Sequence, residues 1–103
     1  MNNFETIMMA NLEINDLEGY KVYEEGFFPI LKRHNGVFIT YDDQPEHKEG
    51  DQPLNGRVIL IGFPTDEDAQ NWFNDPEYQA LSEHRRNATN THSITFVKVP
   101  QKS

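Results

Sequence analysis

Residues 57–63, with the sequence RVILIGF, constrain the fold of this chain more than any other segment. In a strand, successive side chains point to opposite faces of the sheet, which places Val58 and Leu60 on one face and Ile59 and Ile61 on the other. All four side chains are apolar, so both faces must be covered. One layer of helices covers one face, and a chain of 103 residues is too short to supply a second sheet for the other. We therefore expect a second copy of the chain to cover it, which gives a homodimer that pairs through the sheet face.

The hydrophobic pattern predicts three more strands and two helices around this segment. Apolar residues alternate in the strands and recur every three or four residues in the helices. The predicted strands cover residues 4–14, 36–41 and 91–99, and the predicted helices cover residues 17–34 and 65–88. The resulting order, βαββαβ, is the split βαβ arrangement. We expect an α+β, ferredoxin-like fold in which two helices cover one face of a four-stranded antiparallel sheet, as a single domain over residues 1–103.

Local motifs mark the ends and irregularities of the two helices. Residues 15–18 (NDLE) fit a capping box, in which an Asn or Asp side chain accepts from the backbone three residues on and the glutamate reaches back. Gly36 suits the left-handed position just after the first helix, and Pro29 within that helix predicts a bend. Asp75 and Pro76 predict that the second helix restarts, with aspartate as its cap and proline at its first position.

Composition argues against several classes of function. The chain has no cysteine, which excludes disulfides and thiol chemistry. Its four histidines lack the spacing that brings two imidazoles to one metal ion, so we expect no metal and no cofactor. A net charge of −8, from 17 acidic residues against 9 Lys and Arg, disfavours binding to nucleic acid or to anionic membranes. Because the sequence shows neither a signal peptide nor a long apolar span, we expect a cytoplasmic protein.

Residues 42–56 (DDQPEHKEGDQPLNG) are polar and rich in turn-forming residues. We interpret them as an exposed connection between two strands. A lid over a substrate site is the alternative interpretation.

Several motifs resemble those of a known family. The most specific is residues 69–81, which read A-x-x-W-F-x-D-P-E-Y-Q-A-L and are followed by Arg85 and Ala88. Supporting matches are the Tyr-rich first helix running into Pro29, and the segments His34–Phe38, Leu54–Arg57 and Gly62–Thr65. From about Met8 to Val99 the chain is similar to the DUF1330 proteins of the dimeric α+β barrel superfamily.

The chain departs from the usual pattern of that family in two places. The family usually has a Gly-Gly pair where this chain has Asn35-Gly36, and its loop corresponding to residues 42–56 is usually shorter. The resemblance implies a ferredoxin-like protomer whose sheet packs against the sheet of a second copy. It supplies no function, because the family is named for the lack of one.

Arg85 and His34 are the candidate catalytic residues. Arg85 lies on the apolar face of the second helix, where a cation needs a partner. It forms either a structural ion pair with one of the many acids or a clamp for the oxygen atoms of an anionic or carbonyl-bearing ligand. Arg57 allows the same two interpretations. His34 lies on the buried stripe near the end of the first helix, either as a capping or core residue or as a general base in a cleft.

Four aromatic residues are candidate ligand contacts: Tyr20, Tyr41, Trp72 and Tyr78. Trp72 and Tyr78 fit a hydrophobic core equally well. Tyr20 and Tyr41, together with Tyr23, bring hydroxyl groups either to a pocket between helices and sheet or to a dimer seam.

Two functions are compatible with these residues. The first is binding or conversion of a small carbonyl- or carboxylate-bearing metabolite, without a metal, in a cleft between helices and sheet. There His34 would move a proton, Arg85 would stabilise a developing enolate or carboxylate, and Tyr41 and Trp72 would lie around the ligand. This hypothesis is an analogy with monooxygenases and isomerases that share the scaffold. The second is a non-catalytic dimeric module with a structural or metabolite-sensing role.

Overall fold

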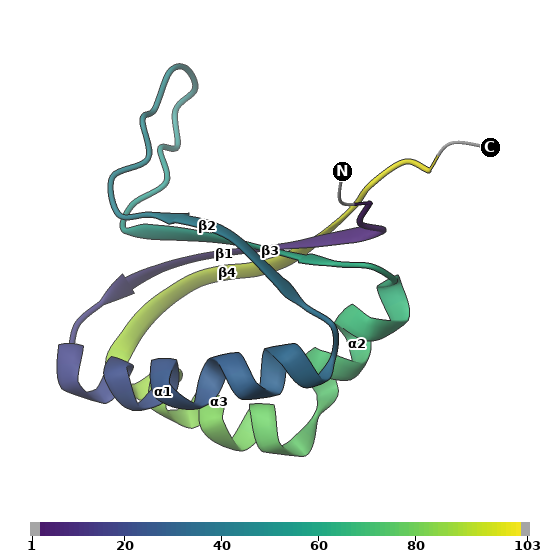
Figure 1. Ribbon diagram of the computed structural model, residues 1–103. Helices are drawn as coiled ribbons and strands as arrows, with labels where there is room; N and C mark the ends of the chain where they lie inside the picture. The colour runs from purple at the N-terminus through teal and green to yellow at the C-terminus, as the bar shows by residue number, and fades with distance from the viewer. Residues whose placement is uncertain (1–2, 102–103) are drawn as a thin grey trace.

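The computed structural model describes residues 3–101, and its strands form one antiparallel sheet with the helices on a single face (Figure 1). In chain order the elements are β1 (Thr6–Ile14), α1 (Leu17–Arg33), β2 (Val37–Asp42), β3 (Arg57–Phe63), α2 (Asp66–Asn74), α3 (Pro76–Ala88) and β4 (Thr89–Lys98). The strands lie side by side in the order β2-β3-β1-β4, and the three pairings are antiparallel. This confirms the α+β, ferredoxin-like fold predicted from the sequence, with the second helical segment divided into α2 and α3.

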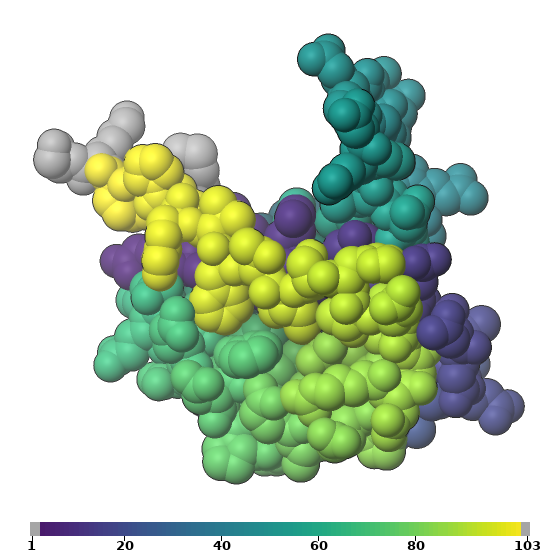
Figure 2. Space-filling model, turned by 180° about the vertical axis from the view of Figure 1, so that it is seen from behind, coloured from purple at the N-terminus to yellow at the C-terminus, as the bar shows by residue number. Residues whose placement is uncertain are grey.

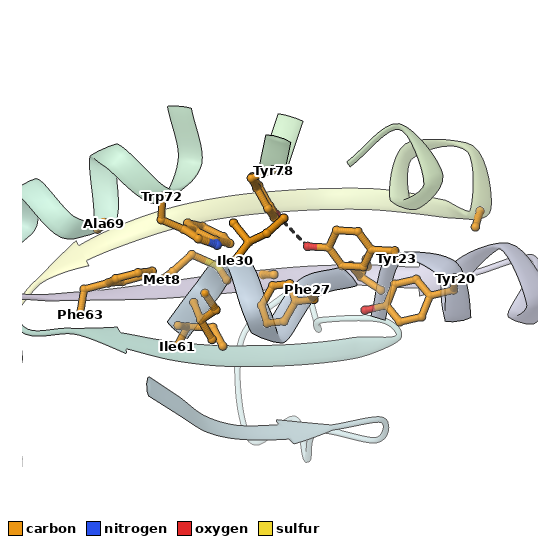
Figure 3. Close-up of a cluster of buried hydrophobic side chains, with 14 residues drawn as sticks. Met8, Tyr20, Tyr23, Phe27, Ile30, Ile61, Phe63, Ala69, Trp72 and Tyr78 are labelled. Carbon is orange, nitrogen blue, oxygen red and sulfur yellow. Dashed lines mark hydrogen bonds between the residues drawn. The ribbon is translucent and has the colours of Figure 1, made fainter. Parts of the chain in front are cut away.

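The side chains of strand β3 alternate between the two faces of the sheet. Ile61 and Phe63 are fully buried on the side of the helices, whereas Val58 and Leu60 on the opposite side are only partly buried. Strand β1 pairs Met8 with Ile61, so the buried residues of the two strands form one layer. Figure 3 shows this layer as a cluster of aromatic and aliphatic side chains between the helices and the sheet.

The face of the sheet opposite the helices is apolar and uncovered. Its outward side chains on β1, β3 and β4 include Ile7, Met9, Leu60 and Val97, and none of these is fully buried. The loop of residues 43–56 rises above this face in Figure 1, and Figure 2 shows a hollow between that loop and the end of β4. Apolar side chains that reach the surface together on one face are typical of a contact site for another molecule.

Helix α1 begins at a single cap and not at the predicted capping box. Asp16 Oδ1 accepts from the backbone N–H of Gly19 at 3.2 Å. Glu18 therefore lies one position before the residue that would reach back to the cap. The N–H groups of Asn15 and Asp16 both bond to the carbonyl of Ala88, which joins the start of α1 to the end of α3.

The end of α1 corrects another prediction from the sequence. The residue in the left-handed conformation is Asn35, with φ of 63°, and not Gly36. The N–H groups of Asn35 and Gly36 bond to the carbonyls of Lys32 and Leu31 at 3.1 and 3.0 Å, the bonding pattern of a Schellman motif. Gly36 is required for a different reason. A Cβ atom there would lie 2.3 Å from Leu31 Cδ1 and 2.9 Å from Phe63 Cε1.

The remaining helix boundaries follow the sequence. Helix α1 continues through Pro29 without a break. Thr65 caps α2 by accepting from the N–H of Asp68 at 3.0 Å, and Asp75 caps α3 with Pro76 in its first turn. None of the helices within residues 3–101 combines the length and the apolar character that crossing a bilayer requires.

Candidate functional site

A cavity of about 50 Å³ lies between the first half of α1 and the sheet. Its apolar lining consists of Met8, Ala10, Leu12, Phe27, Phe28, Phe38, Ile59 and Ile94. Its polar lining consists of Tyr20, Tyr23, Glu24, Tyr41, Arg57, Tyr78 and Arg85. Because Glu24, Phe28 and Tyr41 are exposed while Tyr78 and Arg85 are buried, the mouth lies between α1 and β2, and the inner end lies beside α3.

Irregular pairing in two strands turns Tyr41 and Thr91 toward the helices. In β2 the register shifts between Phe38 and Thr40, so that Phe38 and Tyr41, three residues apart, both lie opposite inward residues of β3. In β4 a similar shift places Thr91 opposite the buried Leu12. A bulge adds one residue to one strand and re-aims the side chains that follow it. Simple alternation along the sequence predicts neither placement.

Arg85 lies at the inner end of the cavity, in the last turn of α3, and only 4% of its surface is exposed. One of its terminal nitrogens, Nη1, donates to Thr91 Oγ1 at 3.0 Å, and the guanidinium carbon lies 5.8 Å from the centre of the Tyr23 ring. Its Nε is buried without a hydrogen-bond partner. Within residues 3–101 no carboxylate forms an ion pair with Arg85, so the structure does not contain the ion pair that the sequence allowed.

A buried cation with an unpaired donor is unusual. Leaving a buried donor unsatisfied costs about 1–3 kcal/mol, and more when the group is charged. Arg85 differs in this respect from Arg57, whose guanidinium contacts two carboxylates. The unpaired Nε and the adjoining cavity together form a site that favours an oxygen-bearing, negatively polarised ligand.

Two tyrosines add a second donor to the inner end. The hydroxyl oxygens of Tyr23 and Tyr78 lie 2.7 Å apart, and the dashed line in Figure 3 marks this hydrogen bond. One hydroxyl donates to the other, so the hydrogen of the second hydroxyl remains available. Burial, reinforced by the neighbouring Tyr78, raises the pKa of Tyr23 well above its ordinary value. Tyr23 therefore stays neutral and keeps its hydroxyl hydrogen at physiological pH.

Arg57 joins three elements at the mouth. Its Nε and Nη2 donate to the two carboxylate oxygens of Asp43 at 2.6 and 3.2 Å, and its Nη1 donates to Glu24 at 3.4 Å. The guanidinium carbon also lies 4.5 Å from the ring centre of Tyr41 and 5.7 Å from that of Tyr20. The hydrogen bond to Asp43 raises the pKa of Arg57 above its ordinary value, and the same bond lowers the pKa of Asp43 below its ordinary value. Burial raises the pKa of Tyr20 to about 12, although Arg57 opposes the effect.

His34 lies outside this cavity. Its Nε2 is 2.7 Å from Asp75 Oδ2, which also accepts from Arg33 at 3.0 Å. The hydrogen bond from His34, together with the backbone N–H of Glu77 and the bond from Arg33, lowers the pKa of Asp75 to about 2. His34 thus joins the end of α1 to the start of α3.

Trp72 also lies outside the cavity. It is fully buried, with its ring centre 4.3 Å from that of Tyr78 and 5.4 Å from that of Phe63. Figure 3 shows Trp72 beside Phe63, while Tyr20 lies at the opposite end of the cluster. Of the residues singled out in the sequence, the structure brings Arg85, Tyr20, Tyr41 and Tyr78 together around one cavity, and it places His34 and Trp72 elsewhere.

Glu24 lines the cavity as well, although it was not among the candidate residues identified from the sequence. Tyr20, Glu24 and Phe27 follow the spacing of one helix face, so a carboxylate between two aromatic residues of that face was a signal that could have identified it. Its partner Arg57 is 33 residues away in the sequence. Among residues 3–101, no group of three or more His, Asp or Glu side chains is arranged to hold a metal ion.

Several solved structures share this fold. They include a protein of unknown function, RPA0582, from Rhodopseudomonas palustris, with a TM-score of 0.72 and 17% identity over 99% of this chain and 86% of that one. SnoaB from Streptomyces nogalater, a cofactor-independent oxygenase, has a TM-score of 0.65 and 13% identity over 97% of each chain. A NIPSNAP domain protein from Burkholderia xenovorans has a TM-score of 0.59 and 16% identity over 93% of this chain and 94% of that one. At these identities the likeness shows the fold alone.

The sequence itself is matched by one family. Among curated proteins none matches this chain. The sequence model of the domain of unknown function DUF1330 matches residues 6–99, which is nearly the whole chain and includes every residue that lines the cavity. The chain belongs to the DUF1330 family.

Proposed function

We propose that this protein binds a small carboxylate- or carbonyl-bearing molecule in the cavity between α1 and the sheet, with Arg85 holding the oxygen atoms of that molecule. The observation that supports the proposal is the buried Nε of Arg85, which has no partner beside a cavity that has room for one. The free hydroxyl hydrogen of the Tyr23–Tyr78 pair is a second donor at the same end. A ligand oxygen carrying negative charge satisfies both donors at once.

The arrangement supports binding more directly than conversion. Donors aimed at an oxygen atom stabilise an enolate if one forms, but a proton transfer also needs an acid or a base within reach. The carboxylate among the lining residues is Glu24, which lies at the mouth and is bonded to Arg57. His34, the general base considered from the sequence, is bonded to Asp75 away from the cavity. We therefore propose a ligand-binding role, with catalysis by this site as the less supported extension.

The Arg85→Met variant tests this proposal. Titration of the ¹⁵N-labelled full chain with acetate, pyruvate, butyrate and acetone should shift the Arg85 Nε–H resonance of the wild type. The variant should bind the same compounds at least about ten-fold more weakly, since a hydrogen bond to a charged group is worth about 1.5–3 kcal/mol.

The stability of the same variant separates a binding role from a structural one. Replacing an unpaired buried cation by an apolar side chain of similar length should leave the melting temperature unchanged or raise it. A wild type that responds to none of these compounds at millimolar concentrations, together with a variant that melts well below it, would mean that Arg85 only supports the fold.

We also propose that the open sheet face pairs with a second copy of the chain. The support is its apolar composition, with Met9, Leu60 and Val97 facing outward, and the hollow that the 43–56 loop borders (Figure 2). Asn11 Nδ2 holds the base of this loop by donating to the carbonyls of Asn55 and Arg57 at 2.8 and 3.2 Å. The loop is therefore anchored where it leaves the sheet, on the same side as the apolar face.

A further inference from the structure

The cavity has opposite charge at its two ends. At the inner end Arg85 is a cation without a carboxylate partner among the described residues. At the mouth, the cation Arg57 contacts the lining carboxylate Glu24 and also Asp43, which is not part of the lining, so the three groups leave one negative charge in excess. A ligand entering from the mouth therefore passes Glu24 and the paired Arg57 before it reaches an unpaired cation.

The wall between the two ends is apolar. Met8, Phe27, Ile59 and Ile94 line it, and Met8 and Phe27 are buried. An unpaired charge held against such a wall loses its hydration without gaining a partner. A second negative charge on the ligand would lie either against this wall or beside Glu24 and Arg57. The first placement leaves the charge without a partner, and in the second Glu24 repels it while Arg57 is already bonded to two carboxylates.

The size of the cavity limits the hydrocarbon part of a ligand. Its volume of about 50 Å³ is roughly a third of the ~150 Å³ apolar cavity that accepts benzene. By the same ratio, the enclosed space holds about two carbon atoms of a ligand's chain. Figure 3 shows the hydroxyl ends of Tyr20 and Tyr23 directed toward the interior of the cluster.

We propose that the ligand of this site is a short-chain monocarboxylate, with its carboxylate on Arg85 and its hydrocarbon chain against Phe27 and Ile59. The proposal rests on the proposed function and adds the number of charges and the chain length. Selection against dicarboxylates is assigned to Glu24, whose carboxylate stands at the mouth.

A ligand series tests the proposal on the full chain. Acetate, butyrate, octanoate, succinate and butyramide are titrated while the Arg85 Nε–H resonance is followed by NMR. Butyrate should bind at least about ten-fold more tightly than succinate, its dicarboxylate counterpart, and than butyramide, its neutral counterpart. Octanoate should bind more weakly than butyrate. Affinity that rises steadily with chain length to octanoate, or succinate binding as tightly as butyrate, would overturn the proposal.

A matched pair of variants tests the role of the mouth. Glu24→Gln should strengthen succinate binding several-fold relative to butyrate binding, because it removes the negative charge that repels a second carboxylate at the mouth. Glu25→Gln makes the same change of charge at the next residue, which is exposed and does not line the cavity, and should leave both affinities unchanged. Equal effects of the two variants would show that general surface charge, and not the mouth, sets the preference.

The outcomes also separate this proposal from the proposed function. If acetone shifts the Arg85 resonance while no monocarboxylate does, the cavity binds a ligand but the chemistry assigned here is wrong. If no compound shifts the resonance and Arg85→Met behaves like the wild type, both proposals fail. Arg85→Lys provides a second variant that keeps the charge and should retain weak butyrate binding without the two-pronged contact.

Discussion

At the scale of single residues, Asp75 connects three parts of the helical layer. Its Oδ2 accepts from His34 and Arg33 of the α1 end, and its Oδ1 accepts from the N–H of Glu77 at 2.8 Å as the cap of α3. Its backbone N–H bonds to the carbonyl of Trp72 in α2 at 3.3 Å. The charge of one carboxylate is thus shared between a cap and two side chains from another helix.

The Asp75→Asn variant should therefore lose stability in a pH-dependent way. Asparagine keeps the cap but loses the charge, and we expect the free energy of unfolding to fall by about 1 kcal/mol at pH 7. The folded-state pKa of Asp75 is lowered from 3.8 to about 2, so its stabilising charge is fully present above pH 4 and is lost as the pH falls toward 2. Urea unfolding of both proteins should show the difference closing over that range.

A control isolates the effect of this position. Asp51→Asn, at an exposed site in the 43–56 loop, should change the free energy of unfolding little at any pH. If the difference between wild type and Asp75→Asn stays constant from pH 7 to pH 2, the charge of Asp75 contributes nothing.

The sequence predicted the local contacts of Asp75 but not its long-range contacts. Asp75 before Pro76 identified a helix cap, because that signal lies within two residues. The bond from His34 to the same carboxylate joins residues 41 positions apart, and no local pattern reports it. The same limit applies to Arg85, whose lack of a carboxylate partner depends on where the acids of other elements lie.

At the scale of elements, the end of α1 depends on two adjacent residues with different roles. Asn35 adopts the left-handed conformation, and Gly36 provides space against Leu31 and Phe63. The sequence pair Asn35-Gly36 predicted a helix end but assigned the left-handed conformation to glycine. Asparagine tolerates that conformation better than most residues, and the buried Leu31 side chain leaves no room for a Cβ on the following residue.

Substitutions at these two positions should therefore differ in effect. Gly36→Ala should lower the free energy of unfolding by about 1–3 kcal/mol, because the added methyl group overlaps Leu31 and Phe63. Asn35→Gly should be tolerated, since glycine adopts a positive φ without strain. Thermal unfolding followed by circular dichroism measures both. A Gly36→Ala protein as stable as the wild type would contradict this account of the helix end.

The positions of the strands were predictable, but the bulges were not. The predicted strand over residues 57–63 matches β3 at both ends, because its apolar run is bounded by Gly56 and Pro64. The register shifts in β2 and β4 turn Tyr41 and Thr91 toward the helices. No residue pattern in the sequence indicates these shifts in the way that Gly56 and Pro64 indicate the ends of β3. Strict alternation would place Phe38 and Tyr41 on opposite faces. Local periodicity therefore could not predict which residues of β2 and β4 face the helices.

At the scale of the whole molecule, the two faces of the sheet differ in what covers them. One is covered by α1, α2 and α3, and the other is exposed in the single chain (Figure 1). If a second copy covers the exposed face, sedimentation at micromolar concentration should give twice the 12.0 kDa mass of one chain. A stable 12.0 kDa species at those concentrations would contradict the proposed pairing.

A pair of valines tests which face is involved. Val97 on the open sheet face and Val22 on α1 are 51% and 43% exposed in the single chain. Val97→Asp should shift the protein toward the monomer, because it buries a charge in an apolar contact. Val22→Asp should leave the sedimentation profile unchanged. Dissociation by Val22→Asp and not by Val97→Asp would assign the contact to the helical surface instead.

The alternation along β3 has a consequence for how this protein can vary over evolutionary time. Arg57 and Ile59 border the cavity, while Val58 and Leu60 belong to the opposite surface. If the proposed ligand and the proposed second copy both bind, neighbouring residues of this strand are under separate selective pressures. Substitutions at residues 58 and 60 would then change the contact with the second copy without altering the cavity, and a substitution at residue 59 would change the cavity without altering that contact.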